Sequence, residues 1–158
     1  MIDALRWYRR WFYAAAFYNA AWAIAVTAFP SQLSHVIGVD VDSSMVPFVQ
    51  VIGMMVGVYA IGYYLLARDP QRYCGFIWIA LAGKTLGPLG FIYYASTGVL
   101  PWTFGWTCVF NDLIWWPVFW SFGLRFARHP LESSSVGRAS RSRPGVTPDP
   151  APSAGEEA

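Results

Sequence analysis

Four stretches of about 20 mostly apolar residues follow one another along this chain, and they constrain its fold more than any other feature. A helix needs about 20 such residues to cross the hydrocarbon core of a bilayer. The stretches cover residues 11–29, 45–67, 73–96 and 101–122. They predict four membrane-spanning helices within residues 11–126, which form an all-α, polytopic membrane four-helix bundle.

The composition fits a membrane protein and excludes several soluble classes. Charged residues make up 13% of the 158 residues, whereas a soluble domain carries about 25%. Two Cys and two His are too few for a disulfide scaffold or a metal cage. The chain has no phosphate-binding loop, nucleophile motif or zinc motif. We therefore expect no metal, no cofactor, no catalytic residue and no nucleic-acid partner, and a non-enzyme is favoured.

The basic residues that flank the predicted spans indicate the orientation. Lys and Arg concentrate in cytoplasmic loops. If the chain crosses the membrane four times, these residues all fall on one side: Arg6, Arg9, Arg10, Arg68, Arg72, Arg125 and Arg128. We therefore expect both termini in the cytoplasm, with residues 1–10 as a cytoplasmic N-terminal segment.

The last part of the chain, residues 127–158, has a different character. It is rich in Ser, Pro, Gly and Arg and poor in bulky apolar residues. Such a segment cannot bury enough apolar surface to offset the entropy cost of ordering. The composition predicts a disordered cytoplasmic tail.

Two charged residues lie near the middle of the predicted spans. Lys84 and Asp112 are each 11 residues from the start of their span, or about 16 Å along a helix. A lone charge at that depth costs about 2.5–3.5 kcal/mol on insertion scales. The matched depth predicts a buried Lys84–Asp112 ion pair, assisted by Asn19 and Asn111 at a similar depth.

Aromatic residues follow Asp112 on the fourth predicted span. Trp115, Trp116 and Phe119 lie within two turns of it. Packing against other helices is the simpler role for large aromatic side chains. In a ligand site, they would hold an apolar body while the ion pair orients a polar head.

Small residues and prolines mark further positions on the spans. Small side chains at helical spacing let membrane helices pack closely, and Pro inside a helix removes a hydrogen bond and kinks it. The predicted packing residues are Gly53, Gly57, Gly83 and Gly87, and the predicted kinks are at Pro88 and Pro117.

These features lead to three functional hypotheses for a protein of the inner membrane. The first is binding of a lipophilic small molecule, such as a quinone, isoprenoid or lipid, or assistance to a membrane enzyme that uses one. The second is a small proton-coupled transporter that acts as a homo-oligomer. The third is an accessory subunit that docks to a membrane-protein partner. The lipid bilayer is the expected environment in each case.

Three strings carry a resemblance to known proteins: AIGYYLLARDP (60–70), AGKTLGPLGF (82–91) and NDLIWWPVF (111–119). Together they resemble small bacterial four-helix membrane proteins. The plan of residues 11–122 is similar to that of DoxX-like proteins, some of which are associated with quinone-linked oxidoreductases. The resemblance implies four spans, both ends inside and a bacterial inner membrane. It rests on architecture, so no site residue is carried over.

Overall fold

The computed structural model describes residues 2–127, and every regular element in this range is helical. This confirms the predicted all-α class. The predicted tail, residues 127–158, lies outside the described residues except for Ala127. The elements in chain order are α1 (Ile2–Ala28), α2 (Pro30–Val36), α3 (Val46–Arg68), α4 (Phe76–Ser96), the short 3-10 helix η1 (Trp102–Phe104), α5 (Gly105–Asn111), the 3-10 helix η2 (Leu113–Trp115), α6 (Trp116–Phe122) and the π-helical turn η3 (Gly123–Ala127).

Two helices, α3 and α4, are long and apolar enough to cross a membrane. Helix α1 qualifies only when it is taken together with α2, which bends away from it by 110°. Among residues 2–127 there are thus two or three candidate spans of this kind rather than four continuous ones. Large apolar side chains also cover the outside of α3, as expected for a surface that contacts lipid: Phe48, Val51, Met54, Val58 and Ile61.

The first helix begins earlier than the sequence predicted. Instead of starting near residue 11, α1 is helical from Ile2 and includes much of the segment expected to precede the span. A contact with α3 accompanies this extension, because Arg9 Nε donates a hydrogen bond to the Ala67 carbonyl over 2.8 Å. A cation at the carboxyl end of a helix is favourable because the carbonyls there carry partial negative charge.

The range predicted for the fourth span, residues 101–122, is not one continuous helix in the structure. The chain forms η1, α5, η2 and α6 in that range, and the main interruption is at Asp112. The Trp115 N–H donates to the Asp112 carbonyl, three residues back, so the helix tightens into a 3-10 turn there. Pro117 lies in the first turn of α6 rather than inside a helix. At that position its missing N–H costs nothing, because the first N–H groups of a helix have no partner within the helix.

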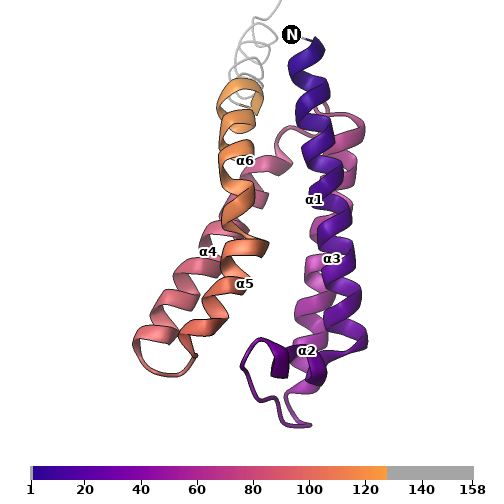
Figure 1. Cartoon of the computed structure of the whole chain (residues 1–158). Coiled ribbons are helices and arrows are strands. Elements are labelled where there is room, and N and C mark those ends of the chain that lie inside the picture. The colour runs from indigo at the N-terminus through magenta and orange to yellow at the C-terminus, as the bar shows by residue number, and fades with distance from the viewer. Residues whose placement is uncertain (1, 128–158) are drawn as a thin grey trace, which may run out of the picture. The chain divides into compact units, whose positions relative to one another are not determined.

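The helices fall into two neighbouring groups (Figure 1). Helix α1 packs along α3 over most of its length, and α4 packs against α5 and α6. Gln50 Nε2 on α3 donates to the Thr27 carbonyl on α1 over 3.0 Å. The two groups join through an aromatic core built around the first turns of α1: Tyr8, Phe12, Tyr63, Phe119 and Phe122.

The ends of the helices also follow a simple arrangement (Figure 1). The start of α1, the α3–α4 connection and the end of α6 lie at one end of the bundle, whereas α2 and the α4–α5 connection lie at the other. Gly98 lies two residues after the end of helix α4, and its φ of 77° suits glycine because it has no Cβ. The Val99 and Gly98 N–H groups then donate to the Tyr94 and Ala95 carbonyls, which closes the helix as in a Schellman motif.

Candidate functional site

A buried ion pair joins α4 to the interruption between α5 and η2. Lys84 Nζ lies 3.1 Å from Asp112 Oδ1, and the two residues are only 4% and 9% exposed. The predicted Lys84–Asp112 pair is therefore confirmed. Each charge has its partner in a place where a lone charge would be costly to bury.

The helix interruption supplies a second partner for the lysine. In a continuous α-helix the Asn111 carbonyl would accept the Trp115 N–H. That N–H instead donates to the Asp112 carbonyl, and Lys84 Nζ donates to the carbonyl of Asn111. A buried backbone carbonyl that an irregular turn leaves without its helical donor needs another partner, and Lys84 provides it.

Two glycines on α4 allow the close approach of the other helices. A methyl group at Gly83 would lie 2.7 Å from the Tyr59 hydroxyl oxygen, and one at Gly87 would lie 3.1 Å from Asp112 Oδ2. Both distances are tighter than ordinary contact, so larger residues would displace these side chains. The same reasoning holds for Gly53, where a methyl group would lie 2.6 Å from Thr27 Oγ1 on α1. At Gly57 it would meet Ala23 at an ordinary 3.5 Å.

The two asparagines behave differently. Asn111 Nδ2 donates to Asp112 Oδ1 over 3.1 Å, the same carboxylate oxygen that Lys84 contacts. Asn19 is 1% exposed, and its Nδ2 donates to the Ala15 carbonyl of its own helix. Asn19 thus lines the same pocket as the ion pair, but its amide nitrogen bonds to the backbone of α1.

The ion pair lies in the wall of a pocket between the two helix groups, which we call the polar pocket. Its volume is 380 Å³, within the usual range for small-molecule sites. Helix α3 supplies most of its apolar wall. The lining residues are Asn19, Ile52, Met55, Val56, Tyr59, Gly83, Lys84, Gly87, Asn111 and Asp112.

A second pocket adjoins the first, and we call it the inner apolar pocket. It has a volume of 430 Å³ and is lined mostly by apolar side chains of α1, α2, the following loop, α3, η1 and α5, including Trp22, Leu33 and Phe104. Five residues belong to both linings: Ile52, Val56, Gly87, Asn111 and Asp112. Together the two pockets place one charged, hydrogen-bonding wall beside a larger apolar space.

The predicted aromatic residues lie elsewhere. Trp115 and Phe119 are 4% and 0% exposed and pack in the aromatic core, where Trp115 contacts Trp11 and Tyr18. Neither these two nor Trp116 lines the polar pocket or the inner apolar pocket. The apolar side chains beside the ion pair come from α3 instead. Ile52, Met55, Val56 and Tyr59 follow helical spacing on α3, and the sequence pattern alone did not set them apart from lipid-facing residues.

The two prolines differ in their positions. Pro88 lies inside α4, four residues after Lys84, and α4 continues past it to Ser96. Its missing N–H leaves the Lys84 carbonyl without the usual helical donor. The predicted kinks at Pro88 and Pro117 stay predictions.

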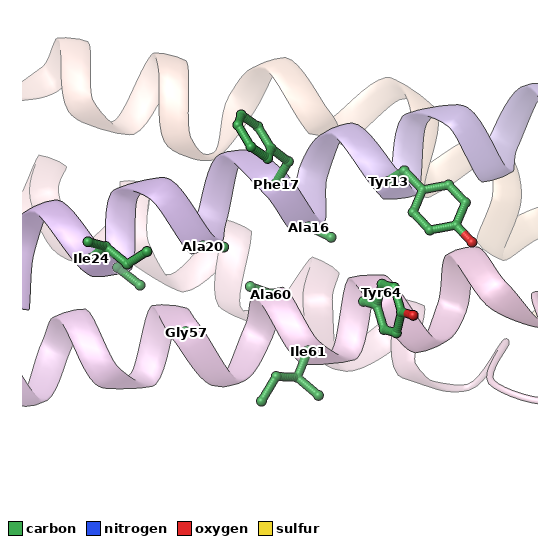
Figure 2. A pocket seen from close by; sticks show the side chains of 10 residues that line it. Tyr13, Ala16, Phe17, Ala20, Ile24, Gly57, Ala60, Ile61 and Tyr64 are labelled. Carbon is green, nitrogen blue, oxygen red and sulfur yellow. The ribbon is translucent and has the colours of Figure 1, made fainter.

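A larger groove of 530 Å³ lies on the outer face of α1 and α3 (Figure 2). Its floor is formed by small residues such as Ala16, Ala20 and Gly57, with Phe17 and Ile61 at its sides. Its lining contains no charged side chain. This outer groove therefore fits lipid chains or another apolar surface, whereas the polar pocket has groups that can orient a ligand.

The chemistry available at the polar pocket is limited. Within residues 2–127 no group of three or more His, Cys, Asp and Glu side chains is placed to hold a metal ion. The pocket combines one carboxylate, one ammonium, two amides and the hydroxyl of Tyr59, which suits binding and orientation of a polar head. Comparison with protein-family models, with curated proteins and with solved structures finds no match to this chain, so the DoxX-like resemblance gains no support from them.

Proposed function

We propose that this chain is a multi-pass protein that binds a lipophilic small molecule in the polar pocket and the inner apolar pocket, or presents it to a membrane enzyme. The molecule would be a quinone, an isoprenoid or a lipid. The observation that carries the proposal is the shared lining of the two pockets, with the Lys84–Asp112 pair on one side and apolar residues on the other. A polar head would contact the pair while an apolar tail fills the larger space.

The proposal includes a topology with both termini in the cytoplasm of a bacterial inner membrane. Four crossings would need α5, η2 and α6 to act as one interrupted span beside α1, α3 and α4. Broken helices cross membranes where the freed backbone groups are buried in protein or line a cavity, and the Lys84 bond to the Asn111 carbonyl meets that requirement. Reporter fusions after Gly98 and after Ala127 test this topology, since the two points should lie on opposite sides.

The binding proposal is tested by purification in native lipid particles followed by mass spectrometry of small molecules. We expect one lipophile to co-purify with the wild-type chain and to be lost from the double variant Lys84→Met with Asp112→Leu. Thr85→Val is the matched control. It removes a polar group next to Lys84 whose hydroxyl donates to the Leu81 carbonyl of its own helix and which does not line either pocket.

Two outcomes would contradict the proposal. The same lipophile retained at equal stoichiometry by the folded double variant would show that the ion pair has no part in binding. A stoichiometric protein partner without any small molecule would favour the accessory-subunit hypothesis, with the outer groove of Figure 2 as a docking surface.

A proton-coupled transporter is a second candidate function, and the interruption at Asp112 favours it. Transporters build their sites from interrupted helices near the middle of the membrane, and here a carboxylate lies at such an interruption. Uptake into proteoliposomes that follows a pH gradient in the wild type and disappears in Asp112→Asn would support this function. Uptake that neither follows the pH gradient nor changes in Asp112→Asn would exclude the transporter function.

A further inference from the structure

The polar pocket contains donors and acceptors that lack hydrogen-bond partners, and these constrain the head group of a ligand. A lysine ammonium has three donors, and Lys84 Nζ donates to the Asn111 carbonyl and to Asp112 Oδ1. Both Lys84 and Asn111 direct their bonds with the carboxylate to Oδ1. Asp112 Oδ2 faces Gly87, at 3.1 Å from where a Cβ would lie.

Asn111 provides a further acceptor. Its Oδ1 is buried and has no hydrogen-bond partner among the described residues. The orientation of this amide is set by chemistry, because an ionised carboxylate only accepts hydrogen bonds and must therefore face Nδ2. The oxygen is left on the other side of the amide group, in a residue that lines both pockets. A buried acceptor of this kind favours a ligand that brings a donor.

The charges in the pocket select against ionic head groups. Lys84 and Asp112 neutralise each other at 3.1 Å, and no other Asp, Glu, Lys or Arg lines the two pockets. An anionic head would approach the carboxylate without a free cation, and a cationic head would face the ammonium. Burying such a charge without its own partner is strongly unfavourable.

From these observations we infer that the ligand is an uncharged lipophile whose head is a hydroxyl group, with its alkyl or isoprenoid part in the inner apolar pocket. The hydroxyl O–H donates to Asn111 Oδ1 or Asp112 Oδ2, and its oxygen accepts the remaining N–H of Lys84. This inference rests on the proposed function and narrows it. Carbonyl and ether oxygens only accept hydrogen bonds, so ketone-like and ether heads would leave the free acceptors of the pocket unpaired.

The test compares four probes with the same apolar tail on the full chain: 1-dodecanol, dodecyl methyl ether, dodecanoate and dodecylamine. Each is added at the same mole fraction in detergent micelles, and bound adducts are counted by native mass spectrometry. We expect dodecanol to reach half-occupancy at a concentration at least tenfold lower than each of the other three. Asn111→Leu should reduce the dodecanol preference over the ether to less than threefold, whereas Thr85→Val should leave it unchanged.

The outcomes separate this inference from the proposed function. Saturable binding of the ether or of dodecanoate as tight as that of dodecanol would overturn the hydroxyl assignment and leave the lipophile site intact. Binding of none of the four probes at any mole fraction would overturn both. Because the wild-type probe series decides the assignment by itself, the inference stays testable even if Asn111→Leu does not fold.

Discussion

The α1–α3 pair and the α4–α5–α6 group are both rich in apolar residues, yet they use them differently. Helices α1 and α3 run without interruption for 27 and 23 residues and meet through small residues such as Gly53 and Gly57. In the other group, α4 contains Pro88, and α5 gives way to a 3-10 turn at Asp112. Inside the helices of the continuous pair the backbone groups bond to each other, whereas the interruption in the other group depends on the side chain of Lys84.

The contrast shows where ligand chemistry can be placed in a small bundle. An uninterrupted helix offers only side chains to its surroundings, because its interior N–H and C=O groups are paired with each other. An interruption exposes a carbonyl, and here a lysine joins that carbonyl to a carboxylate. Helix α3 of the continuous pair supplies most of the apolar wall that faces these polar groups.

Removing one charge of the buried ion pair in the α4–α5–α6 group should lower the free energy of unfolding more than the other substitutions proposed below. Asp112→Leu leaves Lys84 buried without a counter-charge, which should lower the free energy of unfolding by about 3 kcal/mol. Lys84→Met added to Asp112→Leu should recover more than half of that loss, because no charge is then buried. Denaturant unfolding in mixed micelles measures both values, and losses that simply add would contradict the paired arrangement.

The packing of α1 against α3 can be tested at two glycines of α3 that lie one helical turn apart. Gly53→Ala should destabilise the protein by about 1–3 kcal/mol, since its methyl group overlaps Thr27 Oγ1 and lies 3.1 Å from the Thr27 backbone nitrogen. Gly57→Ala should be neutral or stabilising by up to about 1 kcal/mol, because alanine favours the helix and its methyl group meets Ala23 at 3.5 Å.

The same unfolding assay in mixed micelles compares these two variants. Equal effects of Gly53→Ala and Gly57→Ala would mean that α1 and α3 do not pack as closely as the structure places them.

A single side-chain hydrogen bond links α1 to α6, where the two helix groups meet. Tyr8 on α1 is 3% exposed, and its hydroxyl donates to Ser121 Oγ on α6 over 3.0 Å. Tyr8→Phe should lower the free energy of unfolding by about 1 kcal/mol. Tyr93→Phe, at a tyrosine that is 63% exposed, is the control and should change it by less than half as much. A larger loss from the control would place the stabilising contact elsewhere.

The loop before α3 should give the smallest effect, and it depends on pH. The Ser44 hydroxyl and the Ser44 and Met45 amides donate to Asp42 Oδ1, and these bonds lower the pKa of the Asp42 carboxyl. Because the folded-state pKa lies below the unfolded value of about 3.9, the stabilisation is present above that pH and is lost as pH falls through the folded-state pKa. Carbon-detected NMR titration should show that Ser44→Ala raises the pKa of Asp42, and an unchanged pKa would refute the turn.

The ion pair could be predicted from sequence because depth along a span depends only on the rise per residue. Lys84 and Asp112 lie at equal distances from the ends of their predicted spans, and desolvation leaves them few partners except each other. The interruption at Asp112 could not be predicted in the same way. Pro117 signals a disturbed helix, but which carbonyls are freed depends on whether Lys84 is within reach, and that is a tertiary contact. The role of Ile52, Met55 and Val56 was hidden for a similar reason, since lipid-facing and pocket-facing apolar residues look alike in sequence.

The bend of 110° between α1 and α2 has a consequence for how a ligand would enter and leave. It brings Pro30, Leu33 and Ile37 into the wall of the inner apolar pocket, and α2 is a helix of only seven residues. The head group would be recognised at Lys84, Asn111 and Asp112, on other elements of the chain. Selectivity and residence time would therefore be set by separate parts of the molecule, so substitutions in α2 could change how long a ligand stays without changing which ligand is chosen.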